Sequence, residues 1–175
     1  MDRLVQMVAV VTGATRGLGL AIAHTFAREG AIVVMTGRSR AEGERCAAAI
    51  GESASFVPCD LTDLNSIEGL VAAVDERFGR IDILVNNAGD LYRANLLDLP
   101  LEEYERISRL NLTAPLLLTQ LVGRIMVRER KGGSIINVTS TGSSVCRPGA
   151  AANHVTKAGL AMLTRIAAPH LVQYG

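Results

Sequence analysis

The chain has 175 residues, a formal net charge of +1 at pH 7 and 49% hydrophobic residues. This length corresponds to about one domain with a substantial core, and the near-neutral charge gives no electrostatic reason to expect nucleic acid or an anionic membrane as a partner. Its 3 cysteines are far apart and lack metal-ligand spacing, and no signal-peptide pattern begins the chain, so we expect a cytoplasmic protein with reduced thiols and no metal site.

Strand-like and helix-like patterns alternate along the chain. Apolar runs predict strands at 8–11, 32–35, 55–59, 83–85 and 134–138, and helical spacing predicts helices at 18–28, 41–50, 64–78, 101–130 and 150–174. Such alternation, with right-handed crossovers, predicts one α/β domain over residues 1–175: a doubly wound parallel sheet between two helical layers, the Rossmann fold. Ligands bind beyond the carboxyl ends of the strands in such sheets, so the segments that follow each strand are the candidate binding segments.

The segment after the first strand, residues 12–19, reads Thr-Gly-Ala-Thr-Arg-Gly-Leu-Gly and leads directly into a helix. Glycine lets the backbone take positive φ and approach a phosphate closely, and the free N–H groups of a helix N-terminus attract a pyrophosphate. An ordinary glycine-rich turn is the alternative. We predict that this segment binds the phosphates of a cofactor through Gly13, Thr15, Arg16, Gly17, Leu18 and Gly19.

The segment after the second strand, residues 36–39, contains Arg38 and Ser39 but no acidic residue. Sheets that bind NAD usually carry an Asp or Glu here for the ribose hydroxyls. Arg38, together with Arg16, is able to bind a 2′-phosphate instead, since guanidinium groups form charge-assisted pairs with phosphate. Against the simpler interpretation of two surface arginines, the pattern favours NADP(H) over NAD(H).

The third strand is followed by Asp60, and either Thr62 or Asp63 is expected to cap the next helix. The acceptor oxygens of Asp60 suit the amino group of an adenine, although an exposed loop carboxylate is the plain alternative. The fourth strand runs into Asn-Asn-Ala-Gly at 86–89, where two amides and two small residues leave room for a cofactor sugar.

The Thr-Gly-x-x-x-Gly-x-Gly and Asn-Asn-Ala-Gly motifs together resemble those of the short-chain dehydrogenase/reductase family, over essentially the whole chain. In detail the chain looks like the 3-oxoacyl-carrier-protein reductase and glucose dehydrogenase branch. The resemblance implies an NAD(P)(H)-dependent oxidoreductase that acts on a carbonyl/alcohol pair. It also places Asp60 with Leu61 beside the adenine, and Asn87, Ala88 and Gly89 beside the ribose near the nicotinamide.

The long apolar region at 110–127 contains several polar residues, so we interpret it as a core or interface helix and not as a membrane span. By the same resemblance, Asn111 in this region is the asparagine that holds a water in the family's proton relay. Pro115 has no N–H, which leaves the carbonyl of Asn111 without its normal helical partner and open to such a water. A simple proline kink is the alternative.

The family's catalytic residues are matched only in part. Ser140 aligns with the serine that holds the substrate carbonyl, and Lys157 with the lysine of the Tyr-x-x-x-Lys motif, which binds the ribose and lowers the tyrosine pKa. Asn153 stands in the position of that tyrosine, and an amide cannot serve as a general acid. His154 lies next to it and near Lys157 on the helix, so it is either a substitute acid or a helix-surface histidine.

The last helix departs from the family in two further ways. Pro169 is expected to kink or end it, and the family continues with two more strands and a substrate-covering loop, where this sequence ends at Gly175. We therefore expect an exposed edge strand or apolar surface, and a homo-dimer or homo-tetramer formed through the apolar helices.

These observations support three hypotheses. The first is an NADP(H)-dependent oxidoreductase, impaired by Asn153, with a small carbonyl or alcohol substrate. The second is a non-catalytic dinucleotide-binding or partner subunit, and the third is an inactive variant or fragment of an active reductase.

Overall fold

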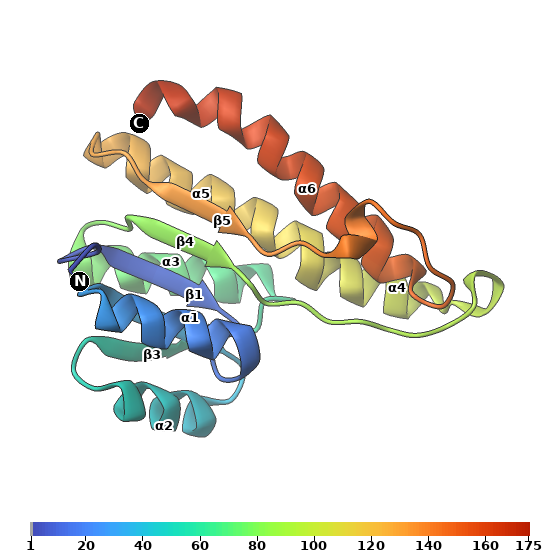
Figure 1. The fold of residues 1–175 in the computed structure, drawn as a ribbon, viewed down its shortest axis with the longest axis horizontal. Coiled ribbons are helices and arrows are strands. Elements are labelled where there is room, and N and C mark those ends of the chain that lie inside the picture. The colour runs from blue at the N-terminus through green and yellow to red at the C-terminus, as the bar shows by residue number, and fades with distance from the viewer. Residues whose placement is uncertain (1) are drawn as a thin grey trace.

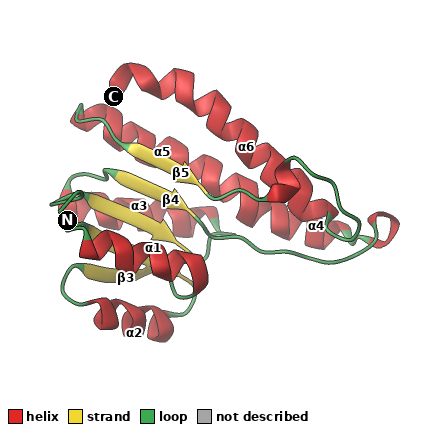
Figure 2. Cartoon of the chain, viewed as in Figure 1, coloured by secondary structure: helices red, strands yellow, loops and turns green. Residues whose placement is uncertain are grey.

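The computed structural model describes residues 2–175, which form a parallel sheet flanked by helices (Figures 1 and 2). The strand order is β3-β2-β1-β4-β5, and every neighbouring pair is parallel. The strands are β1 (Val8–Thr12), β2 (Ile32–Gly37), β3 (Ala54–Pro58), β4 (Ile83–Asn86) and β5 (Ser134–Asn137). The helices are α1 (Gly17–Arg28), α2 (Arg40–Ile50), α3 (Leu64–Phe78), α4 (Leu101–Ser108), α5 (Ala114–Glu129) and α6 (Ala151–Leu171). The predicted doubly wound Rossmann fold is confirmed.

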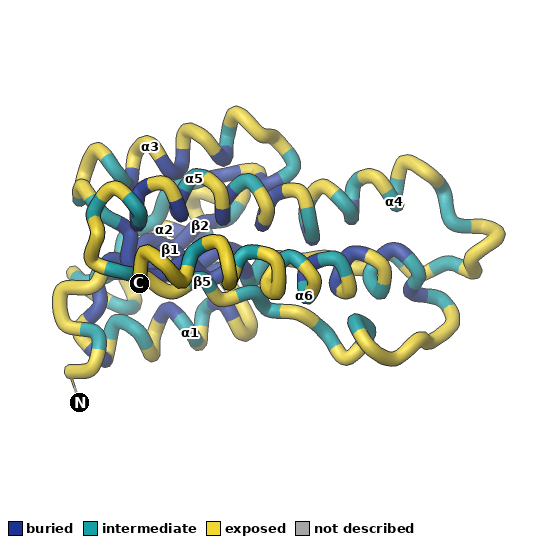
Figure 3. The backbone as a smooth tube through the Cα atoms, turned by 90° about the horizontal axis from the view of Figure 1, so that it is seen from above, coloured by how far each residue is buried: buried dark blue, intermediate teal, exposed yellow. Residues whose placement is uncertain are grey.

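The apolar side chains of the central strands divide between two cores. Val8 and Val10 point to a core shared with α3 and α5, whereas Ala9 and Val11 point to a core shared with α1 and α2. This division follows from the two-residue period of a strand, which sends successive side chains to opposite faces. Because both faces are covered by helices (Figure 3), the run at 8–11 can be apolar without alternation.

The carboxyl ends of the strands lie in register at one edge of the sheet. Thr12 pairs with Thr36 between β1 and β2, and Asn86 pairs with Asn137 between β4 and β5. The loops after β4 and β5 extend well beyond this edge, beside α4 and the start of α6 (Figure 1). A parallel bridge between Ala94 and Ala150 holds the two loops together. The segments predicted to bind the cofactor therefore converge at one edge.

The long helical region is continuous from Leu101 to Glu129, but its middle, Arg109–Thr113, is a π-helix. By length and composition alone this stretch is able to cross a membrane, with a mean hydropathy of 1.4 over a window of which 50% is buried in the fold. Ala114, Leu118 and Val122 belong to the core shared with α3, so this region packs as a core helix does.

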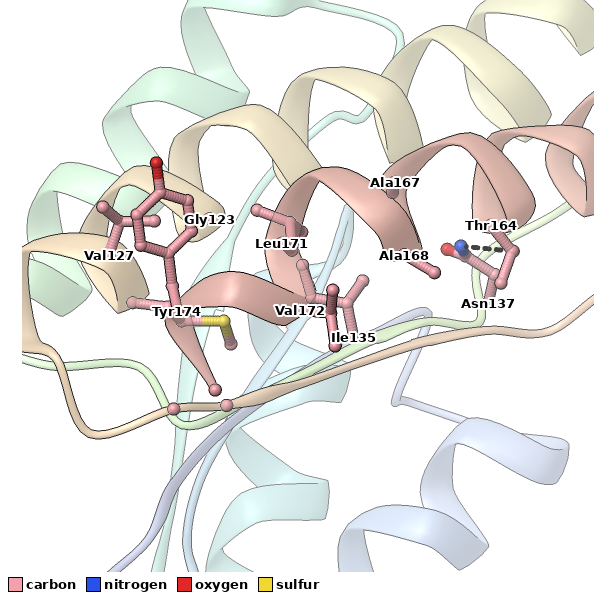
Figure 4. A pocket seen from close by; sticks show the side chains of 14 residues that line it. Gly123, Val127, Ile135, Asn137, Thr164, Ala167, Ala168, Leu171, Val172 and Tyr174 are labelled. Atoms are coloured by element: carbon pink, nitrogen blue, oxygen red, sulfur yellow. Dashed lines mark hydrogen bonds between the residues drawn. The ribbon is translucent and has the colours of Figure 1, made fainter.

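The last helix, α6, continues through Pro169 to Leu171, so the proline does not end it. A 3-10 turn at Val172–Tyr174 takes the place of the last three residues of the predicted helix. α6 packs against α4 and α5 and runs beside β5, the edge strand. A groove of about 240 Å³ lies between β5, α5 and the end of α6 (Figure 4). Asn137 donates to the Thr164 hydroxyl at 2.9 Å in this groove, and Ile136 of the edge strand is 42% exposed. β5 is the edge strand of the sheet that the described residues form.

Candidate cofactor and catalytic site

The glycine loop leaves the N-terminus of α1 open. Gly13 and Gly17 have φ of 62° and 56°, the left-handed region that favours glycine. A Cβ added at Gly17 would meet nothing within 4 Å. Arg16, the N-cap residue, places no side-chain cap on the first turn. The first N–H groups of α1 therefore face open space at the carboxyl edge of the sheet, as a phosphate site requires.

The glycine loop is joined directly to the segment after β4. The Asn87 side-chain amide donates to the carbonyls of Thr12 at 2.8 Å and Gly13 at 3.2 Å. The Thr12 hydroxyl accepts the N–H groups of Asn87 and Ala88, both at 3.0 Å. A Cβ at Gly19 would lie 2.3 Å from the Gly13 carbonyl oxygen, so only glycine fits there. The two motifs thus form one rigid unit, in which the donors of Asn87 are used by the protein itself.

The ends of β2 and β3 place a cation and a carboxylate near one another. Arg38 is exposed, and its positive charge contributes to a lowered pKa at both Asp60 and Asp90. The Ser39 hydroxyl accepts the Glu42 N–H at 3.4 Å as the N-cap of α2. Arg38 is therefore free to reach a ligand, whereas the Ser39 oxygen already serves the helix.

Asp60 is exposed, and one of its two carboxylate oxygens is already hydrogen-bonded within the protein. Its Oδ1 accepts the backbone N–H and the hydroxyl of Thr62, at 2.9 and 2.8 Å. These two hydrogen bonds, the backbone one first, lower the pKa of Asp60. Of the two predicted caps for the next helix, the structure shows Asp63, which accepts the Asn65 N–H. Leu61 is buried in the core with only 6% exposed, so it supports this loop from beneath.

Lys157 is the buried cation of the site. Its side chain is 6% exposed, and its Nζ donates to the Val138 carbonyl at 2.7 Å. Burial lowers the pKa of Lys157. A Cβ at Gly89 would lie 3.3 Å from both this Nζ and Asn111 Oδ1. The structure therefore brings Gly89, Asn111 and Lys157 together, from three segments far apart in the sequence.

Ser140 begins the 3-10 turn Thr141–Ser143 at the end of β5. Its hydroxyl oxygen accepts the Gly142 N–H at 3.1 Å. His154 packs against this loop: a Cβ at Gly142 would lie 2.3 Å from its ring, and its Nδ1 accepts the Arg147 N–H at 3.4 Å. The ring of His154 is thus half-buried and packs against the loop that carries Ser140.

Asn111 is fully buried in the π-helix that precedes Pro115. The π-helical hydrogen bond, from Ala114 N–H to the Arg109 carbonyl, agrees with a helix disturbed by the proline. The Asn111 side chain does not face a ligand: its Oδ1 accepts the Asp90 N–H and its Nδ2 donates to the Asp90 carbonyl, both at 3.0 Å. Any role in a proton relay therefore belongs to its main-chain carbonyl.

Asn153 lies one helical turn before Lys157 on α6 and is half-buried. Its Nδ2 donates to the Asp90 carbonyl at 3.4 Å. Thr156 also joins this cluster, because its hydroxyl accepts from Asn111 Nδ2 at 3.2 Å and donates to the Ala152 carbonyl at 2.8 Å. No sequence motif marks Asp90 or Thr156 as a site residue. The only signal for Asp90 was its place directly after the Asn-Asn-Ala-Gly motif.

Comparisons with known proteins agree with this site. A family model described as short chain dehydrogenase matches residues 7–175. Galactitol 2-dehydrogenase of Agrobacterium fabrum is 40% identical over 173 residues, which cover 99% of this chain and 68% of that protein. The 3-oxoacyl-[acyl-carrier-protein] reductase of Synechocystis sp. is 35% identical over 179 residues, which cover 100% of this chain and 72% of that protein.

Solved structures show the same likeness. The crystal structure of a metagenomic short-chain oxidoreductase in complex with NADP has a TM-score of 0.93 and 35% sequence identity, over 98% of this chain and 79% of that chain. The matched family model, the relatives and the shared fold lead to one conclusion: the chain belongs to the short-chain dehydrogenase/reductase family of oxidoreductases.

Proposed function

We propose that this chain binds NADP(H) at the carboxyl edge of its sheet and is a carbonyl/alcohol oxidoreductase whose proton transfer is impaired. Proteins of the family bind nicotinamide dinucleotides, and one solved neighbour is in complex with NADP. The observation that carries the proposal is the glycine loop, where Gly17 combines a positive φ with open space at a helix N-terminus that no side chain caps. The residues present fit a pyrophosphate.

The preference for NADP(H) rests on Arg38 and Arg16. Both are exposed, and the segment after β2 holds no carboxylate that would bind a ribose hydroxyl or repel a phosphate. A 2′-phosphate between two guanidinium groups would form charge-assisted hydrogen bonds.

The other residues have roles that follow from their contacts. When bound, the dinucleotide supplies or accepts the hydride. Ser140 accepts the Gly142 N–H, so its hydroxyl hydrogen is available to a substrate oxygen. Lys157 is held by the Val138 carbonyl, where its buried charge would bind ribose hydroxyls and stabilise negative charge on the substrate oxygen.

Asn153 is the reason to expect slow proton transfer and therefore a low turnover. Its amide has no proton that ionises near neutral pH, and a positioned general acid contributes about 10²- to 10⁴-fold in rate. The hydrogen bond from Asn153 to the Asp90 carbonyl favours a second candidate, a dinucleotide-binding subunit without catalysis, because the amide there stabilises the site without donating a proton.

The substrate class that we propose is a small molecule with a carbonyl or secondary alcohol. Relatives named galactitol 2-dehydrogenase, sorbitol dehydrogenase and 3-oxoacyl-[acyl-carrier-protein] reductase share this chemistry. We also propose a homo-oligomer, supported by exposed Val155, Met162 and Ile166, which lie on one face of α6 and are each at least 50% exposed.

The test is calorimetric titration of the parent and of Arg38→Ala with NADPH and with NADH. We expect tighter binding of NADPH by the parent, and about a tenfold loss of that preference in Arg38→Ala, as for a lost charge-assisted pair. Arg40→Ala is the matched control, because Arg40 is exposed two residues away but pairs with Glu44 along α2. Equal affinities in the parent, or an unchanged ratio in Arg38→Ala, would remove the basis for NADP(H).

A further inference from the structure

Asp90 contacts three helical segments at the site, α4, the π-helix and α6, although no sequence motif marks it. Its carboxylate accepts from Arg106 of α4 at 2.8 Å, and it also accepts the N–H of Leu91 at 2.8 Å. Its main-chain carbonyl accepts from Asn111 in the π-helix and from Asn153 in α6. One residue of the loop after β4 is thus bound both through its side chain and through its backbone.

The backbone contacts of Asp90 form a closed pair with Asn111. The Asp90 N–H and carbonyl are bound by the two ends of a single amide, at 3.0 Å each. Asn111 is fully buried, so water cannot replace the partners of this amide, and breaking either hydrogen bond would cost free energy. The position of the Asp90 main chain and the position of Asn111 are therefore coupled.

The residue before Asp90 carries this coupling to Lys157. Gly89 lies so close to the Lys157 ammonium and to Asn111 Oδ1 that an added Cβ would be 3.3 Å from each. A shift of the loop at 89–90 would change the space around the ammonium. That ammonium is the group that the proposed function assigns to the nicotinamide ribose.

Electrostatics also favour an ionised Asp90. Partial burial pushes the pKa of Asp90 up, but the hydrogen bonds from Arg106 and Leu91, with the charges of Arg106 and Arg38, bring it below its usual value. Arg106 is itself held by Glu103 at 2.9 Å, which orients the guanidinium toward the loop. Asp90 thus stays charged and paired across the neutral range.

We propose that Asp90 is a positioning residue for the nicotinamide half of the dinucleotide site: its carboxylate, paired with Arg106, fixes the main chain that holds Asn111 and places Gly89 beside Lys157. This inference rests on the proposed function. It predicts an effect concentrated on the nicotinamide half of the cofactor. The phosphate and adenine contacts lie on α1, β2 and β3, and among the described residues Asp90 reaches them only through the charge of Arg38.

The test uses two ligands that share only the adenosine half. NADPH spans both halves of the site, whereas adenosine 2′,5′-bisphosphate lacks the nicotinamide half. In Asp90→Ala and Arg106→Met we expect the Kd of NADPH to rise about fivefold, as for the loss of one partly exposed ion pair. The Kd of the bisphosphate should change by less than about twofold. Leu91 and Arg106 donate to different oxygens of Asp90. Asp90→Asn keeps only one acceptor oxygen and so one of these two hydrogen bonds, and it should restore only part of the NADPH affinity.

A matched control comes from the other end of the helical region 101–129. Arg128 forms a comparable ion pair with Asp75 at 2.7 Å, between α5 and α3. Arg128→Met should leave the affinities for both ligands unchanged, even if it lowers the melting temperature as much as Arg106→Met does. Thermal melting of every variant separates loss of fold from loss of binding.

The outcomes are distinct. A parent that binds neither ligand overturns the proposed function and this inference with it. A parent that binds NADPH, with Asp90 and Arg106 variants that weaken both ligands equally or neither, overturns the positioning role alone. If Asp90→Ala does not fold, Arg106→Met and Asp90→Asn decide the same comparison.

Discussion

Replacing Asn153 by tyrosine tests whether a proton donor is all that the site lacks. Asn153 and Lys157 are four residues apart on α6, so their side chains lie on adjacent turns of one helix face, with Cβ atoms about 5–6 Å apart. A phenol at position 153 would stand beside a buried ammonium that is already held by the Val138 carbonyl. We expect Asn153→Tyr to increase ketone reduction.

The size of the effect follows from this geometry. At about 5 Å and an effective dielectric constant of about 20, the ammonium would stabilise a phenolate by about 3 kcal/mol. This interaction lowers the pKa of the new phenol toward the working range, where general acid catalysis contributes about 10²- to 10⁴-fold. The turnover of Asn153→Tyr should therefore exceed that of the parent by about 10²-fold or more.

The assay follows the oxidation of NADPH with a 3-oxoacyl thioester and with a ketose, while NADPH affinity is measured in parallel. Asn153→Phe is the matched control, because it adds the same ring without the hydroxyl. In a Ser140→Ala background the gain should disappear, since the acid acts only on a carbonyl that is already held in place. If Asn153→Tyr binds NADPH well but reduces neither substrate faster than Asn153→Phe, the reasoning fails and a non-catalytic subunit is favoured.

Two further predictions concern stability and assembly. Burial lowers the pKa of Lys157 from its usual 10.5, so between the lowered value and 10.5 the unfolded chain binds more protons and the parent gains stability as the pH rises. The melting temperature of the parent should accordingly rise relative to that of Lys157→Met as the pH rises toward 10.5. A difference independent of pH would contradict this. For assembly, light scattering across concentrations should show an oligomer that Met162→Glu dissociates. Leu97→Glu is the control, because the Leu97 side chain is 96% exposed and lies outside α6. A parent that is monomeric at every concentration would refute the oligomer.

The sequence alone determined the elements of this protein and the edge at which they converge. Apolar runs without alternation mark strands buried on both faces, and helical spacing between them forces crossovers, so the parallel sheet follows from local patterns. Gly13, Gly17 and Gly19 could be read as a phosphate loop because their conformational freedom is a property of the residue itself. The helical spacing of the apolar residues at 150–174 also placed Lys157 on a helix, whereas its role came from the family resemblance.

Tertiary structure decided which side chains are free to bind a ligand. Asn87 looked like a polar anchor for a sugar, yet its amide donors are used by Thr12, 75 residues away. His154 is a neighbour of Lys157 by spacing, but its ring packs under the loop that carries Ser140. A hydrogen-bonding group has few partners, and packing of distant segments settles which of them it meets.

Asp90 is the converse case, a residue that the sequence does not mark but that the folded structure connects to the site. Its importance comes from Arg106, Asn111 and Asn153, which lie 16, 21 and 63 residues away along the chain. Nothing in the local pattern around a loop aspartate encodes those contacts. They exist because α4, the π-helix and α6 pack against one another beside the loop that follows β4, and this packing is a property of the folded chain as a whole.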